Sequence, residues 1–179
     1  MKNISKIIIK TKSIVIEKDL LLRDLELLYQ GLDKFHTGMY WYTPKVSVDR
    51  AFDTARSRIN KDLNVLEFHK LIAPLVALSR EDHTDIFLPK IVNEKLNREI
   101  KFLPLKMVFL GKELYCVKNG SDVQDFVVDR KQIESINGES PVSIVDKIGN
   151  LFASDGFIKT VKYEDLKGLR FLRYYFYYY

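Results

Sequence analysis

The stretch that decides the fold is Asp19–Phe35, which reads DLLLRDLELLYQGLDKF. Its leucines recur at the three- and four-residue spacing that puts apolar side chains on one face of an α-helix. They are Leu22, Leu25, Leu28 and Leu32. Asp19 can cap the start of this helix, and His36-Thr37-Gly38 ends it. We therefore predict a long amphipathic helix as the first main element.

Two further helices are predicted after it. The second begins at Ser47, because one apolar stripe follows, formed by Val48, Phe52, Ala55 and Ile59. The third begins at Asn64, which forms a capping box with Glu67 three positions on. Its apolar residues are Leu66, Leu71, Val76 and Leu78. Pro74 is expected to kink or restart this third helix, because proline lacks the amide hydrogen.

Beyond Ser79 the helical period gives way to short apolar runs. Ile86–Val92 is predicted as a strand, Phe102–Leu110 and Leu114–Val117 as a hairpin, and Asp125–Ile136 as one or two strands. Asn137-Gly138 is a strong turn signal. Pro141 fits the first turn of a short helix that runs through Leu151. A last helix is predicted from Tyr163, although the tyrosine-rich end could equally be a strand.

Helices that precede strands indicate an α+β fold. With the change of pattern near Arg80–Ile86, we predict an N-terminal helical region over residues 1–80 and a small β-rich region over residues 81–179.

Composition and charge limit the classes of function. The 179 residues carry 29 Lys and Arg against 24 Asp and Glu, a net charge of +5. Acidic residues are interleaved throughout and no nucleic-acid-binding module is present, so we expect no nucleic-acid partner. No apolar run approaches the roughly 18 residues of a membrane span. The single cysteine, Cys116, excludes an intramolecular disulfide framework.

The N-terminal segment does not resemble an export signal. Lys10 cuts short the run Ile7-Ile8-Ile9, and no small-residue cleavage site follows. We expect no signal peptide in the chain as written, and the compartment stays open.

His83 is the candidate catalytic residue. It lies in Arg80-Glu81-Asp82-His83-Thr84-Asp85, where neighbouring carboxylates would favour its protonated form and could orient it as a base. The alternative is a solvated charged loop. No metal motif, phosphate-binding glycine loop or G-x-S-x-G nucleophile motif is present, so we predict no metal and no cofactor.

The C-terminus is unusually aromatic. Seven of the 22 aromatic residues lie within the last nine positions, 171–179. Such a segment either packs on this chain's own core or belongs to a larger fold. We expect the second, with the chain stopping before a further domain. Self-association through this segment is a third interpretation.

Several sequence blocks resemble the tail-specific (carboxy-terminal processing) serine peptidases, in the order and spacing of that family. Phe35-His36-Thr37-Gly38-Met39-Tyr40 resembles its His-Pro-Gly-hydrophobic-Tyr block, with Thr37 in place of proline. Glu81-Asp82-His83-Thr84 resembles its Asp-Gly-His-Thr block. Phe102-Leu103-Pro104-Leu105 and the hairpin at Gly111 are similar to the entry of its PDZ-like region. Gln132–Glu139 resembles its Ile-x-Ser-Ile-Asn-Gly block.

The resemblance implies a helical region and a PDZ-like region of a serine peptidase of the tricorn-like branch. The nucleophilic serine of that family belongs to a later domain, and the family often works outside the cytoplasm. His83 takes the position of the histidine that assists that serine, as general base. The chain departs from the family at Glu81, Asp82 and Arg130, which stand in place of aspartate, glycine and glycine.

The partners implied are unstructured proteins or peptides, held as an added strand at a sheet edge. This chain alone is expected to be inactive, since it lacks the nucleophile domain. The alternative is a free-standing peptide-binding or protein-interaction module.

Overall fold

The computed structural model describes residues 14–99, 105–120 and 130–165. The chain divides into two compact units. The helical unit comprises Lys12–Lys95 and Asn150–Ile158. The sheet unit comprises Met1–Thr11, Leu96–Gly149 and Lys159–Tyr179. The division that we expect at residue 80 stays a prediction.

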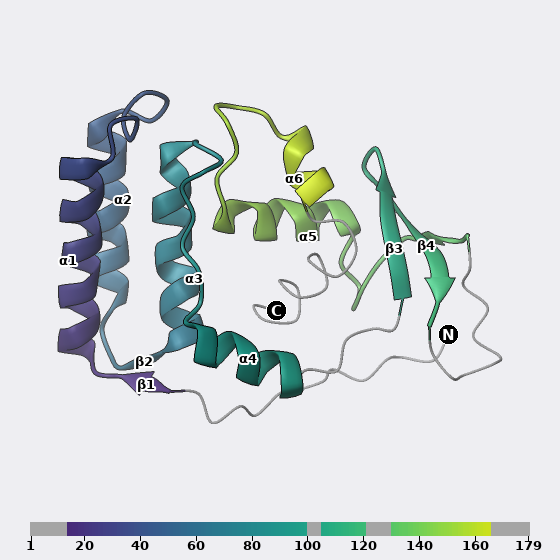
Figure 1. Cartoon of the computed structure of the whole chain (residues 1–179), viewed down its shortest axis with the longest axis horizontal. Coiled ribbons are helices and arrows are strands. Elements are labelled where there is room, and N and C mark those ends of the chain that lie inside the picture. Colours follow the sequence, from purple (N-terminus) through teal and green to yellow (C-terminus); the bar gives the residue numbers. More distant parts are fainter. Residues whose placement is uncertain (1–13, 100–104, 121–129, 166–179) are drawn as a thin grey trace. The chain divides into compact units, whose positions relative to one another are not determined.

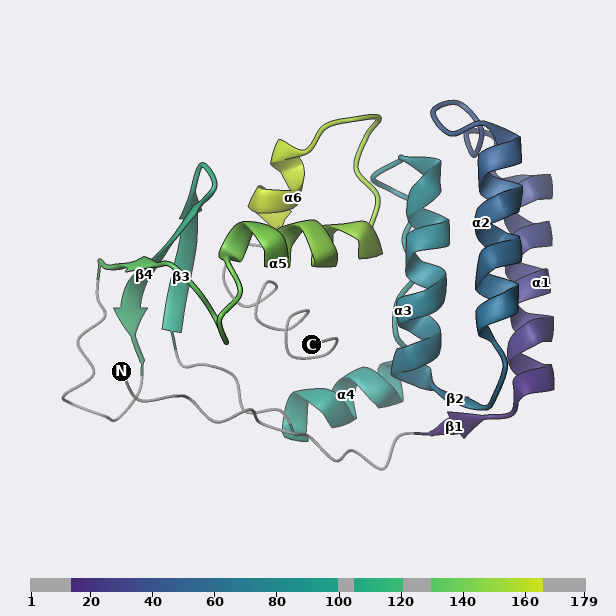
Figure 2. The ribbon, with the colours of Figure 1, turned by 180° about the vertical axis from the view of Figure 1, so that it is seen from behind.

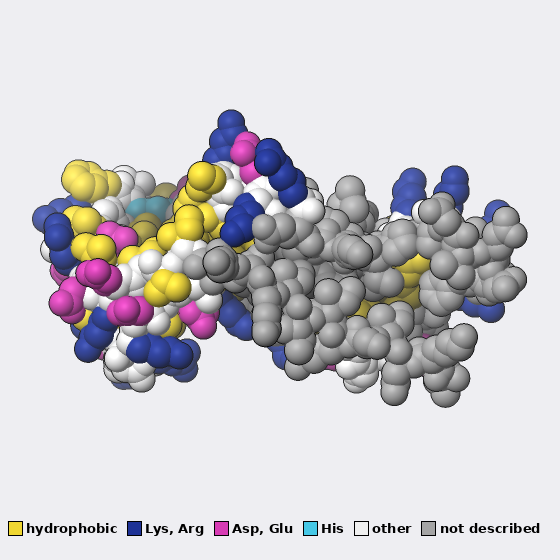
Figure 3. Space-filling model, turned by 90° about the horizontal axis from the view of Figure 1, so that it is seen from below, with side chains coloured by type: hydrophobic (Ala, Val, Ile, Leu, Met, Phe, Trp, Pro, Cys, Tyr) yellow, Lys and Arg dark blue, Asp and Glu magenta, His cyan; other side chains and the backbone are white. Residues whose placement is uncertain are grey.

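Three helices form the body of the helical unit (Figure 1). Its elements are β1 (Val15–Ile16), α1 (Lys18–Phe35), α2 (Lys45–Arg58), β2 (Leu63–Asn64), α3 (Val65–Val76) and the 3-10 turn η1 (Ala77–Ser79). β1 pairs antiparallel with β2, which places the start of α1 beside the start of α3. Seen from the end that carries β1 and β2, the surface of this unit mixes apolar side chains with charged ones of both signs (Figure 3).

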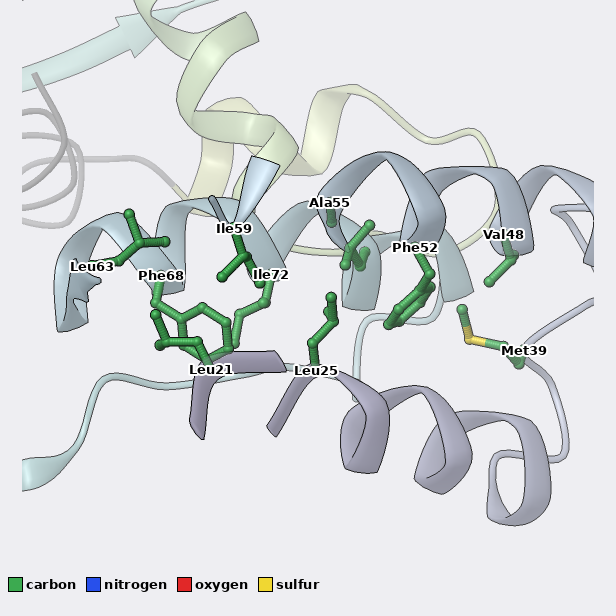
Figure 4. Close-up of a cluster of buried hydrophobic side chains, with 11 residues drawn as sticks. Leu21, Leu25, Met39, Val48, Phe52, Ala55, Ile59, Leu63, Phe68 and Ile72 are labelled. Atoms are coloured by element: carbon green, nitrogen blue, oxygen red, sulfur yellow. The ribbon is translucent and has the colours of Figure 1, made fainter. Parts of the chain in front are cut away.

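The core of the helical unit is built from the stripes that the sequence predicts. Leu21 and Leu25 of α1 point toward Phe52 of α2 and Phe68 of α3 (Figure 4). The Phe52 ring also meets the Tyr29 ring edge to face, with 5.1 Å between centroids. Burying such large apolar side chains supplies most of the stability of a small helical bundle. The three predicted helices are therefore confirmed, with a common apolar core.

Two predicted helix ends are confirmed and two differ. α1 ends at Phe35 with His36 as its C-cap, as predicted. Asn64 and Glu67 form the predicted capping box at the start of α3. Asp19 was expected to cap α1 but lies in its first turn, with Glu17 at the cap position. The second helix begins at Lys45 rather than Ser47, since Pro44 already provides the extended residue before a helix. α3 continues through Pro74 to Val76 without restarting.

The predicted strand Ile86–Val92 is wrong. Residues 84–89 have no regular structure, and α4 (Lys90–Glu99) begins inside the expected strand. Pro89 explains the change, because its carbonyl accepts the amides of Val92 and Asn93 in the first turn. Proline with its fixed φ favours the start of a helix.

The sheet unit holds a three-stranded antiparallel sheet in the order β3-β4-β5. β3 (Leu105–Leu110) and β4 (Glu113–Asn119) form the predicted hairpin, and β5 (Gln132–Ile133) pairs with β4. Asn137 and Gly138 both have positive φ, 51° and 81°, as a two-residue turn of the I′ type requires. α5 (Pro141–Ile148), the turn η2 (Gly149–Leu151) and α6 (Thr160–Asp165) follow.

An α+β architecture is thus confirmed for the described residues. The predicted strand residues 125–129 and the aromatic segment 171–179 lie outside the described residues. Among the described residues, no helix combines the length and the apolar character needed to cross a bilayer.

Candidate functional site

The candidate site lies on two loops of the helical unit, one after α1 and one after η1. The first loop starts at His36, whose amide closes α1 on the Leu32 carbonyl at 3.2 Å. Two further turns follow, with Met39 N bonded to His36 O and Trp41 N bonded to Gly38 O. Met39 is fully buried and anchors the loop to the core. Backbone hydrogen bonds therefore fix this loop from His36 to Trp41.

His36 joins this loop to the second one. Its Nε2 lies 2.7 Å from Oγ1 of Thr84 and 3.1 Å from Oε2 of Glu81. Thr84 Oγ1 also donates to Glu81 Oε2, at a long 3.4 Å. The His36 side chain is only 13% exposed, whereas that of Glu81 is 45% exposed. We call these three residues the imidazole cluster.

The second loop takes its shape from two backbone features. Arg80 adopts the left-handed conformation, with φ 53°, and turns the chain out of η1. The segment 150–158 then pairs with it: Gly156 N donates to Arg80 O at 2.9 Å, and Asp82 N donates to Asp155 Oδ1 at 2.9 Å. Gly156 has φ 57°, and a Cβ there would lie 3.3 Å from the Tyr42 ring. This position therefore favours glycine on two grounds.

Exposed aromatic side chains lie in these two loops, at the end of α1 and in the segment 150–158. Phe35, Trp41 and Phe157 are 82%, 75% and 70% exposed. The Arg80 guanidinium carbon lies 4.3 Å from the centroid of the Phe157 ring, within cation–π range. Tyr42 meets Phe157 edge to face at 6.1 Å. We call Phe35, Trp41, Tyr42 and Phe157 the aromatic rim.

Hydrogen bonds and ion pairs fix the first loop to α1 and α2. Tyr40 donates to Asp33 at 2.5 Å, and Lys45 Nζ lies 3.1 Å from the same carboxylate and 2.9 Å from Asp49. Hydrogen bonds from Tyr40 and then Lys45 hold the pKa of Asp33 below its usual range. Burial, followed by the bond to Asp33, raises the pKa of Tyr40 to about 12. The stabilisation from Asp33 is therefore present at neutral pH and is lost as the pH falls through its lowered pKa.

His83 lies in the same second loop, one residue before Thr84. Its side chain is exposed, and among the described residues it makes no hydrogen bond or ion pair. Of the carboxylates expected beside it, Glu81 contacts His36 instead. The imidazole ring of His83 is thus open to a group outside this unit, and its role as a general base stays a prediction.

The third histidine, His69, belongs to the core. Its Nε2 lies 3.0 Å from the Ile86 carbonyl, and burial lowers the pKa of its imidazole. The contact of the buried His69 ring with the Ile86 carbonyl therefore holds residues 84–89 against α3.

In the sequence, His36 is part of a block that resembles the family, and no role is predicted for it. The structure makes His36 the residue that links the two blocks. The sequence signal for this role was a histidine directly after a long predicted helix and two residues before a glycine.

The two loops bring together side chains that can donate and accept protons. An imidazole, a carboxylate and a hydroxyl lie within hydrogen-bond distance of one another. Within residues 14–99, 105–120 and 130–165, no three His, Cys, Asp or Glu side chains are arranged to hold a metal ion.

Comparisons with protein-family models, with curated proteins and with solved structures give no match.

The contact between His36 and Glu81 is expected to contribute about 1 kcal/mol to the free energy of unfolding, the usual value of a partly buried hydrogen bond. A double-mutant cycle with His36→Ala and Glu81→Ala, measured by urea denaturation, should show this coupling. The matched cycle pairs His36→Ala with Asp82→Ala, because the exposed Asp82 side chain makes no hydrogen bond or ion pair with His36 in the described structure. The second pair should be additive. Equal coupling in both cycles would contradict the assignment.

Proposed function

We propose that this chain is the helical and PDZ-like portion of a tail-specific-type serine peptidase and that it recognises unstructured peptide substrates. The observation that supports the proposal most is the bond between His36 and Glu81–Thr84. Two of the blocks that resemble the family meet here: His36 Nε2 lies 2.7 Å from Oγ1 of Thr84, 48 residues further along the chain. Blocks that share one function are expected to meet in space, whereas unrelated loops have no reason to.

His83 is proposed as the general base for a serine supplied by another domain. The backbone around it is fixed by Arg80, Asp82 and Thr84, which bond to Gly156, Asp155 and Glu81. A base must be held in place while its imidazole remains reachable. The His83 ring is exposed and the backbone of its loop is held by hydrogen bonds, so both conditions are met.

Peptide recognition is proposed at the sheet edge formed by β3. Within the described residues β3 pairs with β4 along one edge, and we place the peptide along the other edge. Met107 and Phe109 of β3 are buried, which holds the strand in register on the core. Val108 lies between them and faces the other side, as alternation in a strand requires. An added peptide strand would gain main-chain hydrogen bonds there, as in PDZ domains.

A peptide titration tests this part of the proposal. A fluorescein-labelled unstructured ten-residue peptide with an apolar, free C-terminus should bind the 179-residue chain with micromolar affinity, read by fluorescence anisotropy. The control is the same peptide with alternate amides N-methylated, which cannot pair as a strand. The control should bind at least about tenfold more weakly, because each lost hydrogen bond is worth about 1 kcal/mol. Equal binding of the two peptides would rule out strand addition.

A second candidate function is a free-standing interaction module. The aromatic rim favours it, since Phe35, Trp41 and Phe157 expose large apolar rings on one unit. Reactivity with a fluorophosphonate probe separates the two. The peptidase hypothesis requires a reactive serine in the natural protein, and the module hypothesis requires none.

A further inference from the structure

A groove runs between α2 and α3 in the helical unit, and no residue of the imidazole cluster lines it. The two helices lie side by side (Figure 2) and bury Phe52 and Ile72 in the core. The groove has a volume of about 380 Å³. Its floor is apolar and includes Ala51, Leu71 and Pro74. The small side chain of Ala51 leaves room for another side chain to enter.

Positive charge borders this floor. Arg50 and Arg58 line it from α2, and Lys70 lines it from α3. No lining residue of the groove is acidic. The acids of α2 are engaged elsewhere: Asp49 with Tyr29 and Lys45, and Asp53 with Arg56. The groove therefore combines three cations with an apolar floor.

The two arginines are available to a partner. Neither the Arg50 nor the Arg58 side chain makes a hydrogen bond or ion pair with the described residues. The two guanidinium groups raise the local potential and would attract a carboxylate-bearing ligand. Guanidinium groups bind carboxylates in a bidentate geometry.

The spacing of the arginines suits a helix. Arg50 and Arg58 are eight residues apart on α2, which at 1.5 Å per residue corresponds to about 12 Å along the axis. Carboxylates at positions i and i+7 or i+8 of a partner helix have nearly the same separation. Such a helix would place an apolar stripe between them, facing Ala51 and Leu71.

We propose that the groove between α2 and α3 binds an acidic amphipathic helical segment of a partner protein. Charge complementarity and the apolar floor together select this occupant, because a nucleic-acid backbone would bring phosphates without apolar side chains for the floor. Helix-in-groove recognition uses this combination of an apolar anchor stripe and flanking charges. The site is independent of the sheet edge and of His83.

The experiment uses the 179-residue chain and a designed probe. The probe is a fluorescein-labelled 16-residue helical peptide with Leu on one face and Glu at positions i and i+7. We expect micromolar binding by fluorescence anisotropy, weakening between 50 and 200 mM salt. The same peptide with Lys in place of Glu should bind at least about tenfold more weakly.

Variants of the chain locate the binding. Charge reversal at Arg50→Glu and Arg58→Glu together should weaken binding at least about tenfold. The matched control reverses two exposed charges of α1, Arg23→Glu and Lys34→Glu, and should leave the affinity within twofold. Ala51→Trp fills the floor while keeping the cations, and it should also weaken binding about tenfold. Circular dichroism of every variant checks that the helices are retained.

Three outcomes would overturn the proposal. They are undiminished binding by the Arg50→Glu/Arg58→Glu variant, an equal loss in the α1 control, and displacement of the probe by a 12-nucleotide DNA strand at the same concentration as by unlabelled peptide. The last would show a general polyanion surface. If Ala51→Trp fails to fold, the arginine variants and the Lys-for-Glu peptide still decide the question.

Discussion

Replacement of Phe52 by alanine is expected to lower the free energy of unfolding of the helical unit by about 3–5 kcal/mol. Phe52 is 1% exposed and belongs to the cluster that α1, α2 and α3 share. Its loss removes the ring contact with Tyr29 and leaves a cavity that three packed helices cannot close easily. Urea denaturation followed by circular dichroism at 222 nm measures the effect, because these helices carry much of the helical signal.

The matched control is the same substitution at Phe35. That ring is 82% exposed at the end of α1, so its removal should change the free energy of unfolding by less than about 0.5 kcal/mol. Comparable losses in the two variants would mean that the helices do not share the core described for them.

Replacement of His83 by alanine is expected to lower kcat/KM for peptide hydrolysis by the natural protein 10²–10⁴-fold, the usual contribution of a general base. This prediction depends on the proposed function. The fall should appear in kcat rather than in KM, since a base acts on the transition state and not on substrate binding. Peptide hydrolysis under steady-state conditions measures it.

Asp82→Ala is the control for His83. The Asp82 side chain is exposed, and its contact with Asp155 is made by its backbone amide, which alanine keeps. The control should retain activity within about threefold. A His83→Ala enzyme with unchanged kcat would exclude His83 as the base.

Local patterns in the sequence were sufficient to predict α1, α2 and α3 and the turn at Asn137-Gly138. The leucine spacing of Asp19–Phe35, the capping box at Asn64 and the Asn137-Gly138 turn each depend on residues a few positions apart. Interactions of this range are visible in a linear sequence. The hairpin around Gly111 belongs to the same class.

The strand predicted at Ile86–Val92 failed for a local reason, Pro89, and for a nonlocal one. An apolar run becomes a strand only if a neighbouring strand offers a free edge, which a linear sequence cannot reveal. Here the Ile86 carbonyl is placed beside His69 of α3, and Pro89 starts a helix. The contact of Ile86 with His69 and the helix start at Pro89 both oppose a strand in this segment.

The imidazole cluster was missed for a similar reason. His36 and Glu81 are separated by α2, β2, α3 and η1, so their contact exists only after those elements pack. The family resemblance drew attention to both blocks but not to the bond between them.

The measurement that tests the central proposal most directly is fluorophosphonate labelling of the natural protein, purified from its source cells with an antibody against this chain. Intact mass and peptide mapping then locate the label. The proposal predicts a product heavier than 21.0 kDa whose labelled serine lies outside residues 1–179. A product of 21.0 kDa that takes up no label would contradict it, and peptide or partner binding would then be the function to pursue.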